Sequence, residues 1–340
     1  MVLDDQNTHH RGERSVPATP QQPDAAPPQR PSIGLALGSG GARGFAHIGV
    51  IHSLLRHGIV PDIIVGTSIG AVVGGCYAAE RLDLLEEWAR GLTRRGILGY
   101  LDISLSGSGL IGGGKLGAKL EEKLGDAAIE TLPTRFAAIA TEIDTGHEIW
   151  LTRGRLSDAL RASYALPGIF PPVALAGRWL VDGALVNPVP VSAARVLGAR
   201  IVIAVNLSFD VLGRATIMAG DSKPAQYGPA EQQDEEPESG GLRALFGLER
   251  TIKRQFVGNG HRPGIPTVMA DAFNIMQDRI TRARLAGDPP DVSIGPRLGQ
   301  VGWFDFHRAG DAIEAGVRAT ERELDLIDEA IATLTPRSAT

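Results

Sequence analysis

A serine flanked by glycines stands where one apolar segment ends and another begins. The sequence GTSIG, residues 66–70, matches the pattern G-x-S-x-G and directly follows the apolar residues 63–65. Such a serine sits on a strained turn from a strand into a helix, where larger side chains two residues away would collide. A helix that begins there also favours negative charge near the hydroxyl. Ser68 is therefore a candidate nucleophile with Gly66 and Gly70 as its elbow; the alternative is a serine that only caps a helix.

A nucleophilic serine needs a group that accepts its proton, and histidine is the usual one. His307 follows in the order serine, aspartate, histidine, but it opens an expected helix, and we expect it at the surface. Asp182 is the better candidate because it ends the apolar segment 179–181 and precedes a glycine. Within hydrogen-bond distance of Ser68, it would act as a general base without histidine. The alternative is an Asp-Gly pair that forms a turn.

A glycine-rich loop, LGSGGARG at residues 37–44, follows the apolar segment 33–37. On local sequence alone it either holds a phosphate at a helix N-terminus or stabilises an oxygen that becomes charged during acyl transfer. The first interpretation is a nucleotide-binding protein that uses Gly38–Gly44. Arg43, however, stands where G-x-G-x-x-G requires its third glycine, and Asp62 precedes the second expected strand, whereas a ribose-binding acid follows it.

Three motifs in this order, GSGGARG, GTSIG and VDGALVNPVP, resemble those of the patatin-like phospholipases. The block RASYALPGIFPPV, residues 161–173, is similar to a further block of that family. Within the family the chain is most similar to bacterial single-domain members related to neuropathy target esterase. The similarity covers about residues 33–208 and is weaker toward the C-terminus. Ser39 and Ala184 stand where the family uses glycine, and neither change removes a reacting group.

The resemblance implies a catalytic dyad, with Ser68 as nucleophile and Asp182 as proton acceptor. Gly40 and Gly41 would supply the backbone N–H groups of an oxyanion hole, and Arg43 with Gly44 would support that loop. Family members cleave acyl esters of phospholipids, lysophospholipids or neutral lipids, and the dyad needs neither a metal nor a cofactor. A non-catalytic relative that acts as an adaptor or regulator is the alternative, and the intact dyad disfavours it.

The elements that must position these residues alternate between strands and helices from about residue 32. We expect strands at 33–37, 63–65 and 200–206, a strand pair over 136–151, and helices at 45–55, 69–80 and 307–334. This alternation predicts an α/β fold, a three-layer α/β/α sandwich with a mainly parallel central sheet.

Composition and charge set limits on the partners of the chain. A net charge of −5 leaves no basic field for nucleic acid, and a single cysteine excludes an intramolecular disulfide and a thiolate zinc site. Residues 1–31 are predicted to be a disordered proline-rich tail, and 32–340 a hydrolase domain with a mobile insertion around 210–265. The segment Gly241–Phe256 is predicted to form a basic amphipathic helix, which either contacts a membrane surface or packs on its own domain. Without a signal peptide or spanning segment, we expect a cytoplasmic protein that contacts membranes at most peripherally.

Overall fold

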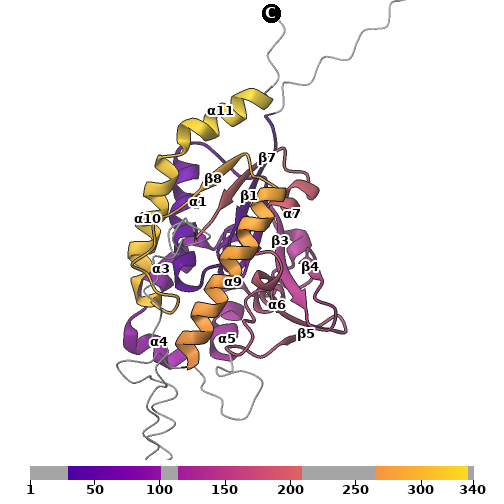
Figure 1. The fold of residues 1–340 in the computed structure, drawn as a ribbon, viewed down its shortest axis with the longest axis vertical. Coiled ribbons are helices and arrows are strands. Elements are labelled where there is room, and N and C mark those ends of the chain that lie inside the picture. Colours follow the sequence, from indigo (N-terminus) through magenta and orange to yellow (C-terminus); the bar gives the residue numbers. More distant parts are fainter. Residues whose placement is uncertain (1–29, 101–113, 209–264, 336–340) are drawn as a thin grey trace, which may run out of the picture.

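A computed structural model describes residues 30–100, 114–208 and 265–335, and in these parts one eight-stranded sheet carries helices on both faces (Figure 1). The strand order is β5-β6-β3-β2-β1-β7-β8, and β4 pairs with β3. The strands are β1 (Ile33–Leu37), β2 (Ile63–Thr67), β3 (Arg135–Glu142), β4 (Glu148–Leu151), β5 (Val173–Leu175), β6 (Arg178–Asp182), β7 (Ile201–Val205) and β8 (Val292–Ile294). The pairs among β3, β2, β1, β7 and β8 are parallel, and those of β4, β5 and β6 are antiparallel. The predicted α/β fold with a mostly parallel sheet is confirmed.

The helices between the strands cover both faces of this sheet. They are α1 (Ala46–Arg56), α2 (Ile69–Ala78), α3 (Leu82–Arg90), α4 (Arg94–Tyr100), α5 (Gly114–Leu124), α6 (Leu156–Ser163), α7 (Val191–Val196), α9 (Ile265–Gly287), α10 (Ala309–Glu321) and α11 (Leu324–Leu334). Short 3-10 turns are η1 (Gly41–Phe45), η2 (Ile129–Thr131), η3 (Gly183–Leu185) and η4 (Phe306–Arg308). These bounds agree with the strands and first helices expected from the sequence.

The central strand β1 contributes to two separate hydrophobic cores. Leu35 and Leu37 point to the core beneath α1, α2 and α10, whereas Ala36 points to the core beneath α7. All five residues of β1 are buried. Because successive side chains of a strand alternate between its faces, burial on both sides requires a continuous apolar run. The three layers follow from this pattern.

The C-terminal part of the chain completes the first core through close packing of α10 on α1. A Cβ built at Gly49 would lie 1.9 Å from the carbonyl oxygen of Ile313, and one at Gly316 would lie 2.0 Å from that of Ala46. Backbones approach this closely only where glycine stands. Glycine at these two positions therefore lets the two helices pack backbone against backbone.

The expectation of one continuous helix over residues 307–334 is wrong. The chain forms η4, then α10, and turns at residues 322–323 before α11. The physical reason is that the two halves of this segment pack against different elements. Helix α10 stays against α1, whereas α11 buries Ile327 in the same core beside β7 and β8. A straight helix could not make both contacts.

Several expectations fall outside the described residues: the tail over residues 1–29, most of the insertion around 210–265, and the segment Gly241–Phe256. Among the helices that the structure describes, none is long and apolar enough to cross a membrane.

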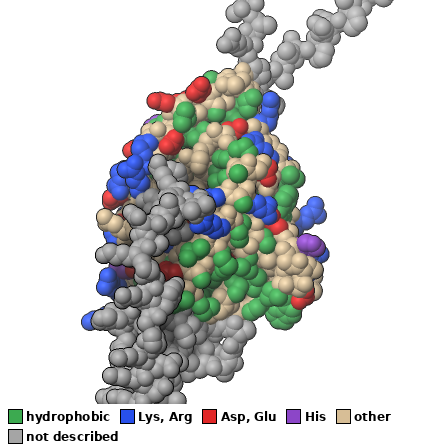
Figure 2. Space-filling model, viewed as in Figure 1, with side chains coloured by type: hydrophobic (Ala, Val, Ile, Leu, Met, Phe, Trp, Pro, Cys, Tyr) green, Lys and Arg blue, Asp and Glu red, His purple; other side chains and the backbone are tan. Residues whose placement is uncertain are grey.

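Figure 2 shows hydrophobic side chains gathered on the lower part of one face, where α9 runs in Figure 1. Exposed members on α9 are Val268, Met269, Ile275 and Met276.

Candidate active site

Ser68 occupies the tight turn between β2 and α2. Its backbone has φ 57° and ψ −124°, a left-handed conformation that is strained for a residue with a side chain. The two flanking positions have no room for a side chain. A Cβ at Gly66 would lie 2.4 Å from the amide nitrogen of Ala71, and one at Gly70 would lie 2.3 Å from the carbonyl oxygen of Leu37. The turn thus has the geometry expected of a nucleophile elbow.

The backbone N–H of Ser68 has a partner that the sequence did not single out. It donates to the hydroxyl oxygen of Ser163 at 2.9 Å, and the Ser163 hydroxyl donates to the carbonyl oxygen of Ile139 at 2.6 Å. Ser163 ends α6 and is fully buried. It therefore links the strained turn to strand β3.

Asp182 meets Ser68 from the end of β6. The hydroxyl of Ser68 donates to Oδ2 of Asp182 at 2.7 Å, and the backbone N–H of Ala184 donates to Oδ1 at 2.8 Å. The Asp-Gly pair does not form a hairpin turn: Asp182 caps η3, and a Cβ at Gly183 would lie 2.3 Å from the carbonyl oxygen of Ile139. Glycine is required there because the chain passes directly over β3.

Burial controls the charge of this carboxyl group. Asp182 is 1% exposed, and its removal from water raises its pKa from 3.8 to about 7. The hydrogen bonds from Ala184 and Ser68 oppose this rise because they favour the carboxylate. Near neutral pH the group therefore exchanges readily between its two protonation states, as a general base requires.

The glycine-rich loop lies beside Ser68. The N–H groups of Gly38 and Ala42 donate to the carbonyl oxygens of Val205 (3.1 Å) and Trp303 (2.9 Å). Between these ties, and within the described parts of the chain, the N–H groups of Gly40 and Gly41 have no acceptor. Gly41 lines the same pocket as Ser68. The amide of Gly41 thus belongs to a residue of the pocket lining, and that of Gly40 directly precedes it.

Space and conformation again require glycine in this loop. Gly41 has φ +59°, and a Cβ there would lie 2.7 Å from the carbonyl oxygen of Trp303. A Cβ at Gly44 would lie 2.1 Å from Cγ2 of Ile69, the residue that follows Ser68. The loop and the elbow are therefore in direct contact.

Arg43 fixes the loop to the C-terminal part of the chain. Its side chain is buried, and Nε donates to the carbonyl oxygen of Val301 (3.2 Å) while Nη2 donates to Oδ1 of Asn274 (3.1 Å). The guanidinium also lies 5.6 Å from the ring centre of Trp303, within range of a cation–π contact. The loop thus depends on α9 and on the segment before η4.

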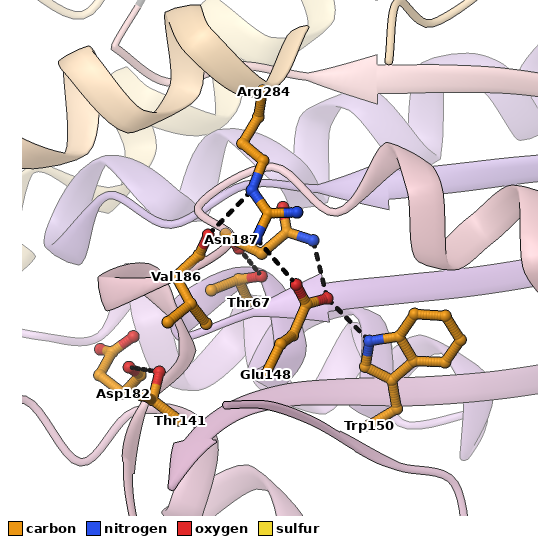
Figure 3. A network of polar contacts seen from close by, with 8 residues as sticks. All are labelled: Thr67, Thr141, Glu148, Trp150, Asp182, Val186, Asn187 and Arg284. Carbon is orange, nitrogen blue, oxygen red and sulfur yellow. Dashed lines mark hydrogen bonds and ion pairs between the residues drawn. The ribbon is translucent and has the colours of Figure 1, made fainter. Parts of the chain in front are cut away.

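A polar network around Glu148 joins β4, α9 and the chain that follows Asp182 (Figure 3). Oε1 of Glu148 accepts hydrogen bonds from Trp150 Nε1 at 2.7 Å and from Asn187 Nδ2 at 2.8 Å. Arg284 donates through Nη2 to the other carboxylate oxygen (3.2 Å) and through Nε to the carbonyl oxygen of Val186 (3.1 Å). The Glu148 carboxylate and the Arg284 guanidinium therefore both hold the chain that follows Asp182, one at Asn187 and the other at Val186.

The same network reaches both members of the candidate dyad. The Thr67 hydroxyl donates to the carbonyl oxygen of Asn187 at 2.8 Å, directly before Ser68 in the chain. The Thr141 hydroxyl donates to the carbonyl oxygen of Asp182 at 2.9 Å (Figure 3). These bonds hold the end of β2 to the chain after η3, and the end of β6 to β3, beside the 2.7 Å contact.

Among the histidines that the structure describes, none forms a hydrogen bond with Ser68 or Asp182. His47 is fully buried and donates through Nε2 to the carbonyl oxygen of Gly38 at 2.7 Å, and burial lowers its pKa to about 4, so the ring is neutral. His307 accepts a hydrogen bond from Arg94 at 3.1 Å, near the surface as expected. None of the described residues that line the pocket is a histidine. The side chain that accepts the hydrogen bond of the Ser68 hydroxyl is Asp182.

Ser68 and Asp182 open into a pocket of about 170 Å³. Most of its lining residues carry apolar side chains. They include Phe45, Ile69, Val72, Cys76, Leu85, Trp88, Leu92, Leu116, Leu120, Leu166, Ile169, Phe170, Trp303 and Phe306. Such a lining suits the hydrocarbon part of a ligand.

Among the described residues, no group of three or more acidic, histidine or cysteine side chains could hold a metal ion.

The nucleotide-binding alternative is not supported by the position of Asp62. Its carboxylate pairs with Arg30 through two contacts of 2.8 Å and accepts the N–H of Ile33. Asp62 therefore lies at the amino ends of β1 and β2, whereas the glycine-rich loop follows the carboxyl end of β1. A ribose-binding acid belongs at the carboxyl end.

Fold and site together define an α/β protein that presents a serine on a strand-to-helix elbow beside a buried aspartate. Comparison with known proteins narrows this class. Residues 35–195 match the family model described as patatin-like phospholipase. An uncharacterized NTE family protein of Mycobacterium tuberculosis is 34% identical over 351 residues, covering 88% of this chain and 92% of that protein. The chain belongs to the patatin-like phospholipase family.

Two further proteins are similar to this chain. Lysophospholipase nte1 of Emericella nidulans is 33% identical over 294 residues, which are 84% of this chain and 18% of that much longer protein. The crystal structure of VipD from Legionella pneumophila aligns over 90% of this chain and 68% of that chain, with 13% identity and a TM-score of 0.44. The resemblance predicted from the sequence motifs is confirmed at the level of the family.

Proposed function

We propose that this protein is a serine lipid acyl hydrolase that cleaves carboxylic esters of phospholipids or lysophospholipids. One observation carries the proposal: the hydroxyl of Ser68 donates to the buried carboxylate of Asp182 at 2.7 Å, inside an apolar pocket. Family membership and the similarity to a protein named lysophospholipase support the substrate class.

The first half of the reaction acylates the serine. Asp182 accepts the hydroxyl proton while Oγ of Ser68 attacks the ester carbonyl and the carbon–oxygen double bond opens to an oxyanion. The N–H groups of Gly40 and Gly41 donate to that oxyanion, a contact worth about 3 kcal/mol per donor in other hydrolases. The intermediate collapses as the ester bond breaks, and the proton on Asp182 passes to the departing alcohol or lysolipid.

The second half restores the enzyme. Asp182 accepts a proton from water as the water oxygen attacks the acyl carbon, and the same two amides hold the new oxyanion. Collapse of this intermediate releases the fatty acid and returns the proton to Oγ of Ser68. The positive end of α2, which begins directly after Ser68, favours the negative charge that develops in both halves.

Contact with a lipid surface is part of the proposal. Exposed apolar side chains on α9, together with Phe304 at the pocket, are 40–50% exposed and suit the boundary of a bilayer or micelle. Phe304 follows Trp303, which contacts the glycine-rich loop. The reacting ester would reach the dyad from this side.

The test is hydrolysis of a defined lipid panel by the full chain. Phosphatidylcholine, lysophosphatidylcholine and short esters are incubated with the protein and with Ser68→Ala, and released fatty acid is measured. The proposal expects release by the protein and none above background by a folded Ser68→Ala variant. Equal release by both would contradict it, and a folded protein that releases none would favour the non-catalytic alternative.

A further inference from the structure

The apolar pocket follows one helix away from the candidate dyad. Ile69, Val72 and Cys76 all line it, and their spacing of three and four residues places them on one face of α2. Helix α2 begins directly after Ser68. At about 1.5 Å per residue, Cys76 lies about 10 Å further along the axis than Ile69. The pocket therefore leads from the reacting serine along α2.

We propose that this pocket binds one acyl chain lengthwise along α2 and that the side chain of Cys76 sets how long a chain the site accepts. The inference rests on the proposed function and names the part of the substrate that the pocket recognises. The ester carbonyl lies at Ser68, and the chain passes Val72 toward Cys76 and Leu120.

The length of α2 matches the length of a membrane acyl chain. The helix has ten residues and spans about 15 Å. The hydrocarbon core of a bilayer is about 30 Å thick and holds two opposed chains, so one chain also extends about 15 Å. The lining from Ile69 to Cys76 covers about 10 Å of this length, so a chain from a membrane lipid reaches Cys76.

Three charged side chains line the pocket. Arg81 follows α2 and therefore lies at the end of that helix away from Ser68, and Lys119 and Lys123 come from α5. The ammonium group of Lys119 is paired with Glu122 on the outer surface at 2.9 Å. Stems of such side chains cover apolar surface while their charges stay in water. Hydrocarbon pushed beyond this end would remove charges from water, which is costly.

Cys76 is suited to define the usable length. It is 3% exposed, and burial raises the pKa of its thiol to about 12, so it remains an uncharged, small apolar group. A larger side chain here would fill the far half of the pocket and leave the half beside Ser68 open. Val72 lies one helical turn closer to Ser68, so a larger side chain there would block shorter chains as well.

The first experiment measures kcat/KM of the full chain for p-nitrophenyl butyrate, octanoate, laurate and palmitate. We expect Cys76→Phe to lower the palmitate-to-butyrate ratio at least tenfold, because each methylene that no longer fits loses about fourfold in binding. Val72→Phe should lower the octanoate-to-butyrate ratio too. Val196→Phe adds the same ring at an exposed position on α7 and serves as the control with an unchanged profile. Cys76→Leu replaces Cys76→Phe if the latter does not fold.

The second experiment measures binding without hydrolysis. Displacement of cis-parinaric acid by fatty acids of the same four lengths is followed in Ser68→Ala, alone and combined with Cys76→Phe. A selective loss of palmitate binding supports the inference even if the protein hydrolyses no ester, in which case only the proposed function fails. Palmitate binding that is absent, or unaffected by Cys76→Phe, overturns the inference, as does an unchanged hydrolysis profile.

Discussion

The hydroxyl of Ser68 lies 2.7 Å from the carboxylate of Asp182 although 114 residues separate them in the chain. The contact joins the ends of β2 and β6, which are both neighbours of β3 in the sheet. Two hydroxyl groups, of Thr67 and Thr141, bind backbone oxygens beside it. The pairing is thus built into the sheet.

Replacing Asp182 by asparagine should remove the proton acceptor and preserve the shape of the side chain. We expect kcat/KM for an ester substrate to fall by about a hundredfold to ten-thousandfold, the usual contribution of a general base. Asp62→Asn is the matched control, because Asp62 is a paired aspartate at the opposite end of the sheet. A fully active Asp182→Asn variant would remove the aspartate from the mechanism.

The rate should depend on pH with a midpoint of about 7. Burial raises the pKa of Asp182 to that value, and only the deprotonated carboxylate accepts the serine proton. We therefore expect kcat/KM to be low below pH 7, to rise through it, and to level off above it. A pH–rate profile on a short ester checks this, and a midpoint near 4 would show that the carboxylate is not buried during catalysis.

The same pKa predicts a stability cost for the site. Between 3.8 and about 7 the folded protein keeps a proton on Asp182 that the unfolded chain releases. The free energy of unfolding should therefore fall as pH rises through this interval, by up to about 4 kcal/mol. Urea unfolding at both ends of the interval measures the fall. Asp182→Asn should reduce it and be the more stable protein at neutral pH; an equal fall in both would contradict the prediction.

Gly41→Ala should disturb the glycine-rich loop. Alanine is strained at φ +59°, at a cost of about 1–3 kcal/mol, and its Cβ would meet the Trp303 carbonyl oxygen at 2.7 Å. We expect a loss of unfolding free energy of that order and a larger relative loss of kcat. Gly58→Ala is the control, since Gly58 has φ +74° but open space around it. If both variants kept full activity, Gly41 would have no role in the reaction.

Glu148→Gln should weaken the polar network that holds Val186 and Asn187, in the chain that follows Asp182. Because Glu148 is not among the residues that line the pocket, we expect kcat to fall, up to about a hundredfold, with little change in KM. Arg282→Gln breaks an ion pair with Asp278 on the same helix α9 without touching the loop, so its kinetics should be normal. Equal kinetics for the two variants would show that the network is only structural.

Much of this architecture was predictable from local sequence. Strand β1 was predictable because burial on both faces demands a continuous apolar run, and the Ser68 turn because crowding demands glycine on either side. The split between α10 and α11 was not, since residues 321–324 contain no glycine or proline and the turn follows from packing on α1.

The partners that hold the site were also beyond local pattern. Glu148 and Arg284 are 136 residues apart, and their meeting depends on the whole fold. Ser163 lies inside the block RASYALPGIFPPV, which pointed to that region but not to its bond with the Ser68 amide. The catalytic roles of Ser68, Asp182, Gly40 and Gly41 stay predictions.

Reaction with a fluorophosphonate tests the central claim most directly, because it requires an activated serine and no knowledge of the natural lipid. The labelled full chain is digested and the modified residue is identified by mass spectrometry, with Asp182→Asn and Asp62→Asn in parallel. We predict one adduct on Ser68, formed much more slowly in Asp182→Asn and at the normal rate in Asp62→Asn. A folded protein that is not labelled, or is labelled at another residue, would contradict the assignment of Ser68 as the nucleophile.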